Sequence, residues 1–354
     1  MLLMPTVIYI DMDYFFAACE ELRHPELKGK TFVVGTSPFE DRRIRGVVQT
    51  CNYETRKLGI HSAMPLIEAF KIKPDLTYLP EDSDYYEATS KKIADLLRAY
   101  GFRMEMDSID EVAMDTADTS YEKAAELAKE MKSKINGQLG LPCTVGVSFG
   151  KTFAKMACDE AKPNGLKIVT EAQVREFLSP KEVGKIPGVG KKIGDRLRAM
   201  GFDTIGKLSK ANPVALFGEF GEVGKYIFLI ANGTETEKIV ENDEALSIGR
   251  ERAVFLDPNN SIEIGEMLRK LSEEAAAEVR KQNLLYKTIT LKVRYNDFTT
   301  HIKSSRLNHY SNSVDMLYDT VVGLSKHLDM TKEINKIGVR VSTLISMKGQ
   351  NTLF

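Results

Sequence analysis

The stretch that most constrains the fold of this chain is an acidic hairpin predicted in its first third. Apolar and polar residues alternate over 104–106, and the run 109–114 is apolar apart from Asp110 and Glu111; short runs of this kind are typical of β-strands. Asp107-Ser108 is a turn signal between the two runs, and the acids Asp110 and Glu111 follow it. Neighbouring carboxylates at a hairpin tip suit a bound cation better than a hydrophobic core, although a solvated turn would also contain such a pair.

A third acid follows another predicted strand. Val7-Ile-Tyr-Ile10 is a short apolar run, as expected for a strand buried on both faces, and it ends at Asp11. If this strand end lies beside the hairpin, three carboxylates come together. Proteins bind Mg²⁺ through a few carboxylates together with substrate phosphates. Asp11, Asp110 and Glu111 are therefore candidates to hold two such ions.

The order of the predicted elements indicates an α+β domain. A helix is expected directly after the first strand, with Asp13 at its N-cap. Further helices are expected over 85–100, 121–135 and 151–161, and a strand over 143–148. Together with the hairpin, these elements predict helices on one face of a mostly antiparallel sheet.

A small mixed unit is predicted between the first two of these helices, with strands over 31–35 and 46–50 and helices around 52–58 and 64–70. Tyr53 and Arg56 are three residues apart and share one helix face. A phenol and a guanidinium in this arrangement can bind a phosphate chain, but the same pair is also common on ordinary helix surfaces.

The length and the cysteines bound the class of protein. A chain of 354 residues can form two or more domains. Its four cysteines lack Cys-x-x-Cys spacing and histidine partners, so we expect reduced thiols of an intracellular protein and no zinc site. The N-terminal apolar run is interrupted by Pro5 and lacks a basic region, which is not typical of a signal peptide or membrane span. We therefore expect a soluble, cytoplasmic protein without membrane contact.

Charge is unevenly distributed along the chain, although the formal net charge is only -1. From Leu246 to the end there are 16 Lys and Arg against 12 Asp and Glu, whereas residues 235–244 contain five acids and one lysine. The polar stretch 232–244 is therefore predicted to link a larger front part to a mildly basic C-terminal domain.

A glycine-rich turn precedes another predicted helix. Pro187-Gly-Val-Gly190 is followed by Lys191 and Lys192 and by helix-forming residues. Free backbone N–H groups at a helix start bind anions, and glycines let the main chain approach a phosphate closely. This helix-hairpin-helix signature predicts contact with a nucleic-acid backbone without reading of sequence, with a plain helical turn as the alternative.

Five motifs in this chain occur in the order and at the spacing found in Y-family DNA polymerases, and they most resemble the DNA polymerase IV (DinB-like) branch. They are Asp11-Met-Asp-Tyr-Phe-Phe16, Cys51-Asn-Tyr-Glu-Thr-Arg-Lys57, Ser108-Ile-Asp-Glu111, Ala161-Lys-Pro-Asn-Gly165 and Ile186-Pro-Gly-Val-Gly190. The resemblance implies a right hand of palm, fingers and thumb followed by a C-terminal little finger. The implied boundaries are 1–23 and 83–171 for the palm, 24–82 for the fingers, 172–234 for the thumb, 235–245 for a linker, 246–347 for the little finger and 348–354 for a flexible tail.

The resemblance also implies roles for individual residues. The catalytic, metal-binding set would be Asp11, Asp110 and Glu111, with the Met12 carbonyl as a further ligand of two Mg²⁺ ions, for which Mn²⁺ could substitute. Nucleotide would be held by Tyr14, Phe15, Phe16, Thr50, Tyr53, Arg56 and Lys162, with Phe16 as the steric gate against a ribose 2′-hydroxyl. DNA would be contacted by Gly188, Gly190, Lys191, Lys192, Arg250 and Arg340. The tail residues Gln350, Leu353 and Phe354 resemble a peptide through which such polymerases hold a sliding clamp.

The sequence thus predicts a monomeric, template-directed, low-fidelity DNA polymerase. It would extend primer-template DNA with deoxynucleoside triphosphates and bypass damaged template bases in DNA repair and damage tolerance. Two alternatives remain: a Mg²⁺-dependent nuclease or nucleotidyl cyclase with the same carboxylate layout, and a non-catalytic DNA-repair scaffold built around the helix-hairpin-helix. The acidic linker differs from the basic linkers of some relatives, so contacts between linker and DNA are not expected.

Overall fold

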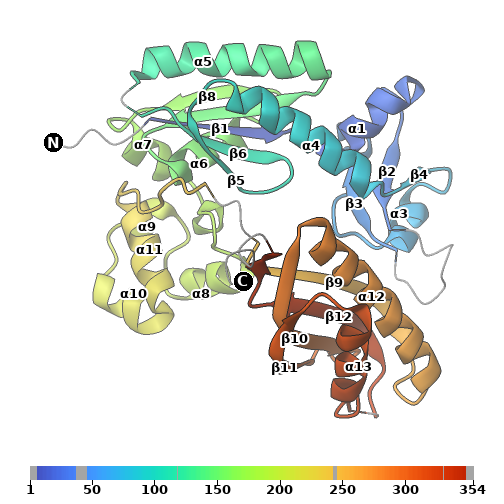
Figure 1. Ribbon diagram of the computed structural model, residues 1–354. Coiled ribbons are helices and arrows are strands. Elements are labelled where there is room, and N and C mark those ends of the chain that lie inside the picture. The colour runs from blue at the N-terminus through green and yellow to red at the C-terminus, as the bar shows by residue number, and fades with distance from the viewer. Residues whose placement is uncertain (1–5, 37–45, 118, 242–244, 330, 348–354) are drawn as a thin grey trace, which may run out of the picture. The chain divides into compact units, whose positions relative to one another are not determined.

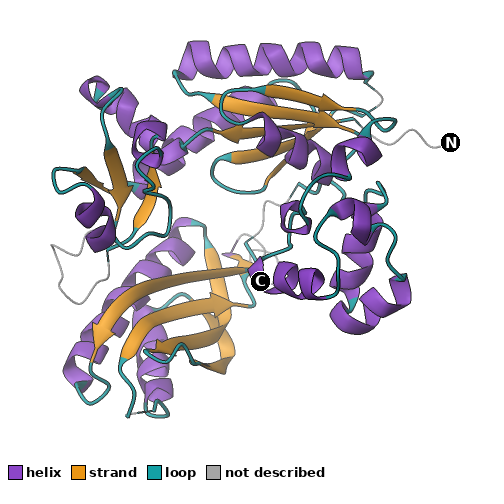
Figure 2. Ribbon diagram, turned by 180° about the vertical axis from the view of Figure 1, so that it is seen from behind, coloured by secondary structure: helices purple, strands orange, loops and turns teal. Residues whose placement is uncertain are grey.

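The computed structural model of the protein describes residues 6–36, 46–117, 119–241, 245–329 and 331–347 (Figure 1, and Figure 2 from the opposite side). Contacts divide the chain into two compact units. The first comprises residues 1–32, 50–56 and 82–242, and the second comprises residues 33–49, 57–81 and 243–354. Neither unit is continuous in sequence.

The first unit is built on a five-stranded sheet of order β5-β6-β1-β7-β8. The strands are β1 Val7–Met12, β5 Arg103–Met106, β6 Glu111–Asp115, β7 Cys143–Ser148 and β8 Leu166–Val169. The predicted hairpin is confirmed, since β5 and β6 pair antiparallel. The central strand β1 is antiparallel to both of its neighbours, whereas β7 and β8 are parallel. The sequence did not predict β8.

Helices cover both faces of this sheet, which differs from the expected single face. The helices that pack on it are α5 Tyr121–Lys134 and α6 Lys151–Ala161, and they lie on opposite sides of the sheet (Figure 1). All six residues of β1 are buried, because alternate side chains point toward each helix layer. On the α6 side, Val7 and Tyr9 form an apolar cluster with Ala154 and Cys158. The continuous apolar character of β1 is therefore the consequence of two covered faces.

The first helix, α1 Phe15–Arg23, begins differently from the prediction. Its N-cap residue is Tyr14, which has φ 40° and ψ 44° in the left-handed region and makes no side-chain cap. The expectation that Asp13 caps this helix is wrong, because the Asp13 carboxylate accepts hydrogen bonds from other segments of the chain. The long helix α4 Ser83–Arg98 is capped by Asp82, whose side chain accepts from the Tyr85 N–H.

Residues 174–231 of the first unit form a small helical subdomain, whose apolar core is continuous with Phe149, Phe153 and Met156 in and just before α6. Its helices are α7 Val174–Leu178, α8 Lys191–Ala199, α9 Ile205–Leu208, α10 Pro213–Phe220 and α11 Glu222–Ala231. A single 3-10 turn, Val183–Lys185, stands where the first helix of the helix-hairpin-helix was expected. Gly188 in the turn before α8 has φ 82°, a conformation that glycine adopts without strain.

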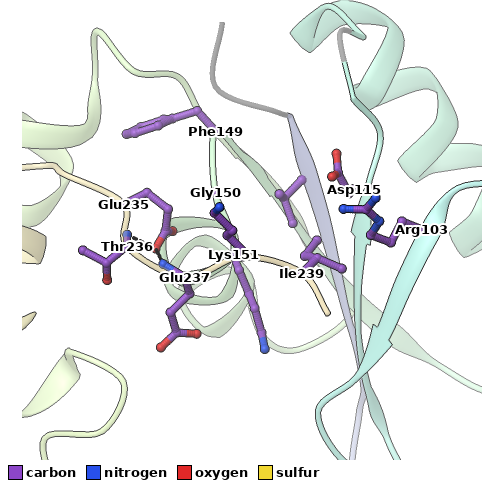
Figure 3. A pocket seen from close by; sticks show the side chains of 11 residues that line it. Arg103, Asp115, Phe149, Gly150, Lys151, Glu235, Thr236, Glu237 and Ile239 are labelled. Carbon is purple, nitrogen blue, oxygen red and sulfur yellow. Dashed lines mark hydrogen bonds between the residues drawn. The ribbon is translucent and has the colours of Figure 1, made fainter. Parts of the chain in front are cut away.

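The acidic segment after α11 packs on the sheet of the first unit. Ile239 is 7% exposed and belongs to the apolar cluster of Val7 and Tyr9. Glu235 accepts hydrogen bonds from the N–H (2.8 Å) and the hydroxyl (3.0 Å) of Thr152 in the first turn of α6. Gly150 makes room for this carboxylate, since a Cβ there would lie 2.4 Å from Glu235 (Figure 3). Residues 235–241 are thus part of the first unit rather than a free connection.

A cavity of about 380 Å³ remains beneath this segment, lined on the sheet side by Val7, Arg103, Asp115, Phe149 and Lys151 (Figure 3). The segment is further fixed by two carboxylates that bond to main-chain N–H groups: Glu105 accepts from Val240, and Glu241 accepts from Met104. Within the segment, Glu235 and Glu241 each accept a hydrogen bond from a main-chain N–H group of the first unit.

The C-terminal part of the second unit is a sheet of order β11-β10-β12-β9 with β13 added to β10. Its elements are β9 Ser247–Leu256, α12 Ser261–Lys281, β10 Leu284–Tyr295, β11 Thr300–Ser311, α13 Val314–Ser325, β12 Ile334–Ser342 and β13 Ile345–Ser346. Both helices pack on one face, where they bury alternate residues such as Ile289, Leu291 and Val339. The other face is open, and β11 on the sheet edge is mostly polar, which is why its sequence does not reveal a strand.

Residues 32–80 form a third, three-stranded sheet of order β3-β2-β4. Its elements are β2 Phe32–Gly35, β3 Val48–Cys51, α2 Tyr53–Arg56, α3 Leu66–Ile72 and β4 Thr77–Pro80. The sequence predicted each of these except β4. In none of the described ranges does a helix combine the length and the apolar character needed to cross a lipid bilayer.

Candidate active site

The predicted acids come together at one end of the central strands of the first sheet. In the register of β1 and β6, Asp11 lies directly opposite Glu111. The Met12 N–H donates to the carbonyl of Asp110 (2.9 Å), so the main chain of the third acid also lies against β1. Asp11 is only 4% exposed. The strand pairing alone therefore brings two carboxylates of the predicted set side by side and places the third next to them.

Two lysines balance these carboxylates. Lys162 Nζ lies 2.5 Å from Asp11 Oδ2, and Lys155 forms an ion pair with Glu111. Burial raises the pKa of Asp11 to about 7, and the charge of Lys162 opposes this rise. Burial alone would also raise the pKa of Glu111, but the hydrogen bond and charge of Lys155 outweigh it and lower that pKa. Asp11 and Glu111 are thus distinct in their affinity for a proton although they are neighbours.

The third acid makes a different contact. The Asp110 carboxylate accepts a hydrogen bond from the Ser108 hydroxyl at 2.6 Å. Within the ranges that the structure describes, no three ligating side chains are already arranged around one point. The donor chemistry nevertheless fits a hard divalent cation, because Asp11, Asp110, Glu111 and the Met12 carbonyl offer oxygen atoms only.

A polar network behind the acids was missed by the sequence analysis. The buried Tyr9 hydroxyl donates to Asp107 (2.8 Å) and accepts from Lys155 (2.9 Å). Lys151, one helical turn before Lys155, forms ion pairs with Asp107 (2.5 Å) and Glu105 (2.9 Å). Burial raises the pKa of Tyr9 far above its ordinary value, so the phenol stays protonated. The i, i+4 spacing of the two lysines on α6 was the available signal, since it places both on one helix face.

The aromatic residues at the start of α1 divide between the interior and the site. Phe15 is 2% exposed and belongs to the core, so its side chain is not accessible to a nucleotide in this structure. Phe16 is half-buried and stacks on the ring of Tyr86, with centroids 4.4 Å apart and planes 12° apart. The Tyr14 ring meets Tyr53 edge to face at 5.2 Å. The start of α1 thus contributes to two aromatic pairs, Phe16 with Tyr86 and Tyr14 with Tyr53.

The remaining predicted nucleotide ligands lie on β3, on α2 and in the loop after α6. Thr50 is buried in β3. The exposed Arg56 lies over the ring of Tyr53 at 5.1 Å, and its Nε donates to the carbonyl of Cys51. Lys162 follows α6 directly and is bound to Asp11. Each of these residues belongs to the first unit, which also contains the three acids.

The predicted DNA contacts lie in two separate places. Gly190 is the N-cap of α8, and Lys191 and Lys192 in its first turn are exposed. Arg340 is exposed on the open face of the C-terminal sheet. Arg250 lies on the opposite, helix-covered face: it pairs in register with the buried Val339 and its guanidinium bonds to Glu278 of α12. Gln350, Leu353 and Phe354 lie outside the described residues.

The open face of the C-terminal sheet is rich in cations. Strand register places five basic side chains on it: Lys292, Arg294, Arg306, Lys336 and Arg340. Glu251 shares this face, opposite Gly338, and bonds both Lys292 (3.0 Å) and Lys336. A flat, positively charged, uncovered sheet surface of this kind is suited to a polyanion.

Comparison with known proteins places these features in a family. Residues 10–159 match the impB/mucB/samB family, residues 245–353 match its C-terminal domain, and residues 171–202 match the IMS family HHH motif. A protein of Methanoculleus marisnigri named DNA polymerase IV is 37% identical over 96% of this chain and 94% of its own length.

Solved structures agree with this match. A Y-family DNA polymerase chimera, Dbh-Dpo4(243-245)-Dbh, superposes with a TM-score of 0.88 at 31% identity, covering 96% of this chain and 99% of the other. The insertion ternary complex of Dbh DNA polymerase gives a TM-score of 0.68 at 31% identity, covering 96% and 99%. The fold and the acid-bearing sheet thus define the class: a Y-family, DNA-directed DNA polymerase. Within that class, the chain belongs to the impB/mucB/samB family, in its DNA polymerase IV branch.

Proposed function

We propose that this chain is a template-directed, low-fidelity polymerase that adds deoxynucleotides to a primer 3′ end by two-metal nucleotidyl transfer and bypasses damaged template bases. The observation that carries the proposal is the pairing of β1 with β6, which places Asp11 opposite Glu111 and Asp110 beside Met12. Three acids with oxygen donors on adjoining backbone supply the kind of ligand that metal-assisted phosphoryl transfer uses.

The acids would hold two Mg²⁺ ions, which would lower the pKa of the primer 3′-hydroxyl and neutralise the triphosphate and the leaving pyrophosphate. Asp11 and Glu111 are proposed to orient the reacting groups, because the strand pairing fixes their separation. The Lys162 side chain is proposed to leave Asp11 and to pair with the triphosphate when a nucleotide binds. Tyr53 and Arg56 would complete the phosphate site from α2, and the Tyr14 ring packs against Tyr53.

Selection of the sugar is assigned to Phe16. The Phe16 ring stacks on the buried Tyr86, and the Tyr86 hydroxyl donates to Glu20 (2.7 Å). The Phe16 ring therefore cannot easily move aside for a larger ligand. A ring fixed in this way would exclude a ribose 2′-hydroxyl from the space in front of it. Phe15, by contrast, would act through packing against Phe16, with ring centroids 5.8 Å apart.

Primer-template DNA is the proposed partner of two surfaces, the α8 turn with Gly188, Gly190, Lys191 and Lys192, and the open face with Arg340. Both bind backbone phosphates in this proposal and read no sequence. Arg250 would act indirectly by tying β9 to α12. The palm, fingers, thumb and little finger retain the boundaries proposed above, except that residues 235–241 are grouped with the palm on which they pack.

Primer extension with all four deoxynucleotides tests the proposal directly. A polymerase produces a template-dependent ladder that requires a divalent cation. A shortened primer would instead indicate a nuclease, and a primer that is shifted in a gel but unchanged in length would indicate a scaffold. A template with one blocking lesion extends the test, since bypass requires products longer than the lesion position.

The C-terminal residues Gln350, Leu353 and Phe354 are proposed to bind a sliding clamp. The support is their sequence alone: a glutamine that can hydrogen-bond in a small pocket and two apolar anchors, which together would raise the local concentration of the enzyme at its primer. Deletion of residues 350–354 should abolish stimulation by the cognate clamp and leave clamp-free extension unchanged. Stimulation that survives the deletion would contradict this part of the proposal.

A further inference from the structure

Asp13 is a buried carboxylate with no role in the site described so far. It lies between β1 and α1 and is 2% exposed. Its Oδ1 accepts from the Thr144 hydroxyl (2.9 Å) and the Tyr53 hydroxyl (3.4 Å), and its Oδ2 accepts from the Asn164 N–H (2.8 Å). A carboxylate is retained at such a position only when donors compensate for its lost hydration.

The donors come from three different segments. Thr144 is on β7 and is itself fully buried, Tyr53 begins α2, and Asn164 is in the loop between α6 and β8. The Asp13 N–H also donates to the carbonyl of Pro142, just before β7. One side chain therefore connects four parts of the first unit that are far apart in sequence.

Two of these segments carry proposed ligands of the triphosphate. Tyr53 is one of them, and Arg56 shares its helix. Lys162 lies two residues before Asn164 in the other segment. The Asp13 carboxylate thus accepts from Tyr53 and from the Asn164 N–H, and so links the two segments that carry proposed triphosphate ligands.

Two residues that adjoin Asp13, its chain neighbour Tyr14 and its hydrogen-bond partner Asn164, have a left-handed backbone conformation, which is uncommon for Tyr and more frequent for Asn. Tyr14 has φ 40° and Asn164 has φ 51°. Such conformations persist where the surroundings determine them, and they gather at functional sites. The Asn164 N–H is fixed by Asp13, and its side-chain oxygen accepts from Lys132 Nζ at 2.5 Å. The loop that presents Lys162 is therefore tied at its left-handed residue.

We propose that Asp13 is a positioning residue for the incoming nucleoside triphosphate: it fixes the Lys162 loop relative to Tyr53 and thereby sets the affinity for the nucleotide. It is not a metal ligand and does not touch the reacting atoms. This inference rests on the proposed polymerase function, because Lys162 and Tyr53 enter it as triphosphate ligands. The inference rests on geometry, because one buried carboxylate accepts from both Tyr53 and Asn164 and thereby sets the distance between their segments.

The test is the kinetics of single-nucleotide insertion by Asp13→Ala, Asp13→Asn and the wild type. Asp13→Ala should raise the KM for the deoxynucleotide on the order of tenfold to a hundredfold while kcat falls less than threefold, because ground-state binding is lost. Asp13→Asn should recover most of the affinity, since the amide oxygen can accept from Asn164 and the amide N–H can donate to the Thr144 hydroxyl. Affinity for primer-template should be the same in each.

Thr144→Val is the matched control, because it removes a bond to Asp13 without touching either proposed ligand segment. It should leave KM within about twofold of the wild-type value. If Asp13→Ala does not fold, Asp13→Glu is the variant that tests the inference. It keeps the charge and the hydrogen-bond acceptors but displaces the carboxylate by one methylene. A KM raised at least tenfold in Asp13→Glu supports the inference, and a KM equal to that of the wild type overturns it.

The outcomes separate this inference from the function on which it rests. A wild type that extends no primer contradicts the proposed function. A wild type that extends primers normally, together with an Asp13→Ala enzyme of unchanged KM, contradicts the positioning role alone. An equal loss of kcat and of kcat/KM in Asp13→Ala would also overturn it, because that pattern belongs to a group acting only in the transition state.

Discussion

The Nζ atom of Lys162 lies 2.5 Å from Oδ2 of Asp11, so the loop after α6 supplies a positive charge to the carboxylate at the end of β1. Burial disfavours an ionised Asp11, and the lysine compensates in part for this cost. In the proposed reaction, a metal ion and a triphosphate would replace this pairing. In that proposal, the contact would connect nucleotide entry with release of the carboxylate.

Removal of the Lys162 charge should affect the two ligands in opposite directions. In Lys162→Met, the KM for deoxynucleotide should rise by about tenfold or more, as expected for loss of a charge-assisted bond to phosphate. Without nucleotide, and at a pH high enough for Asp11 to be ionised in both proteins, Mn²⁺ should bind several-fold more tightly to Lys162→Met, because no amine competes for Asp11; near pH 7 the further raised pKa of Asp11 reduces this gain. The exposed Lys129 on α5 provides a control, and Lys129→Met should change neither value. Weaker Mn²⁺ binding by Lys162→Met would contradict this account.

The stacking of Phe16 on Tyr86 predicts how the enzyme distinguishes sugars. Phe16→Ala should admit ribonucleotides and lower the preference for deoxynucleotides on the order of a hundredfold, since a steric exclusion is removed. Tyr86→Phe keeps the ring that stacks on Phe16 and removes only the hydroxyl bonded to Glu20, so it should keep the preference. The measurement is kcat/KM for matched pairs of nucleotides. An unchanged preference in Phe16→Ala would show that another residue selects the sugar.

The sequence predicted the elements whose local pattern matches their environment. β7 and α6 have the bounds expected from periodicity, and the two-sided burial of β1 follows from its continuous apolar run. β8 was missed because its four residues do not stand out from the loop after Lys162. β11 was missed because its open face and edge position require no apolar alternation.

The candidate site, too, was predictable only where the local sequence pattern matches the environment of the residue. Acids at strand ends and the aromatic motif are visible in the sequence, but the partners that hold them depend on tertiary structure. Asp13 was interpreted as a helix cap because its local context suits one, whereas the fold gives it donors from β7 and from the loop after α6. Lys155 and Tyr9 look like ordinary helix and strand residues until α6 packs on the sheet.

The packing of the acidic segment on the first unit predicts a stability effect at Ile239. Ile239→Ala should lower the free energy of unfolding by about 2–4 kcal/mol, because a nearly buried side chain leaves a cavity in the cluster with Val7 and Tyr9. Val240→Ala is the matched control: this neighbour is 48% exposed, and its loss should cost less than about 0.5 kcal/mol. Urea unfolding of both variants gives the comparison. Equal, small effects would mean that the segment does not stay docked in solution.

Glu251 should weaken DNA binding by the open sheet face. Glu251 forms ion pairs with Lys292 and Lys336 and adds a negative charge to a surface of five cations. Glu251→Gln should therefore tighten primer-template binding and steepen its dependence on log salt concentration by about one to two units. Glu274→Gln on α12 breaks the comparable pair with Arg252 on the helix-covered side and should leave the salt dependence unchanged. An identical salt dependence in Glu251→Gln and wild type would argue against DNA on this face.

The central claim is that the acids at the β1 and β6 ends carry out metal-assisted nucleotidyl transfer. It is tested most directly by the rate of single-nucleotide insertion in Asp110→Asn and in Asp115→Asn, which make the same carboxylate-to-amide change at the two ends of the stretch Asp110–Asp115. We predict that Asp110→Asn loses insertion by at least about a thousandfold in Mg²⁺ and still binds primer-template as the wild type does. Asp115→Asn should insert at a rate close to that of the wild type. Robust insertion by Asp110→Asn, or an equal loss in both variants, would contradict the assignment of the catalytic acids.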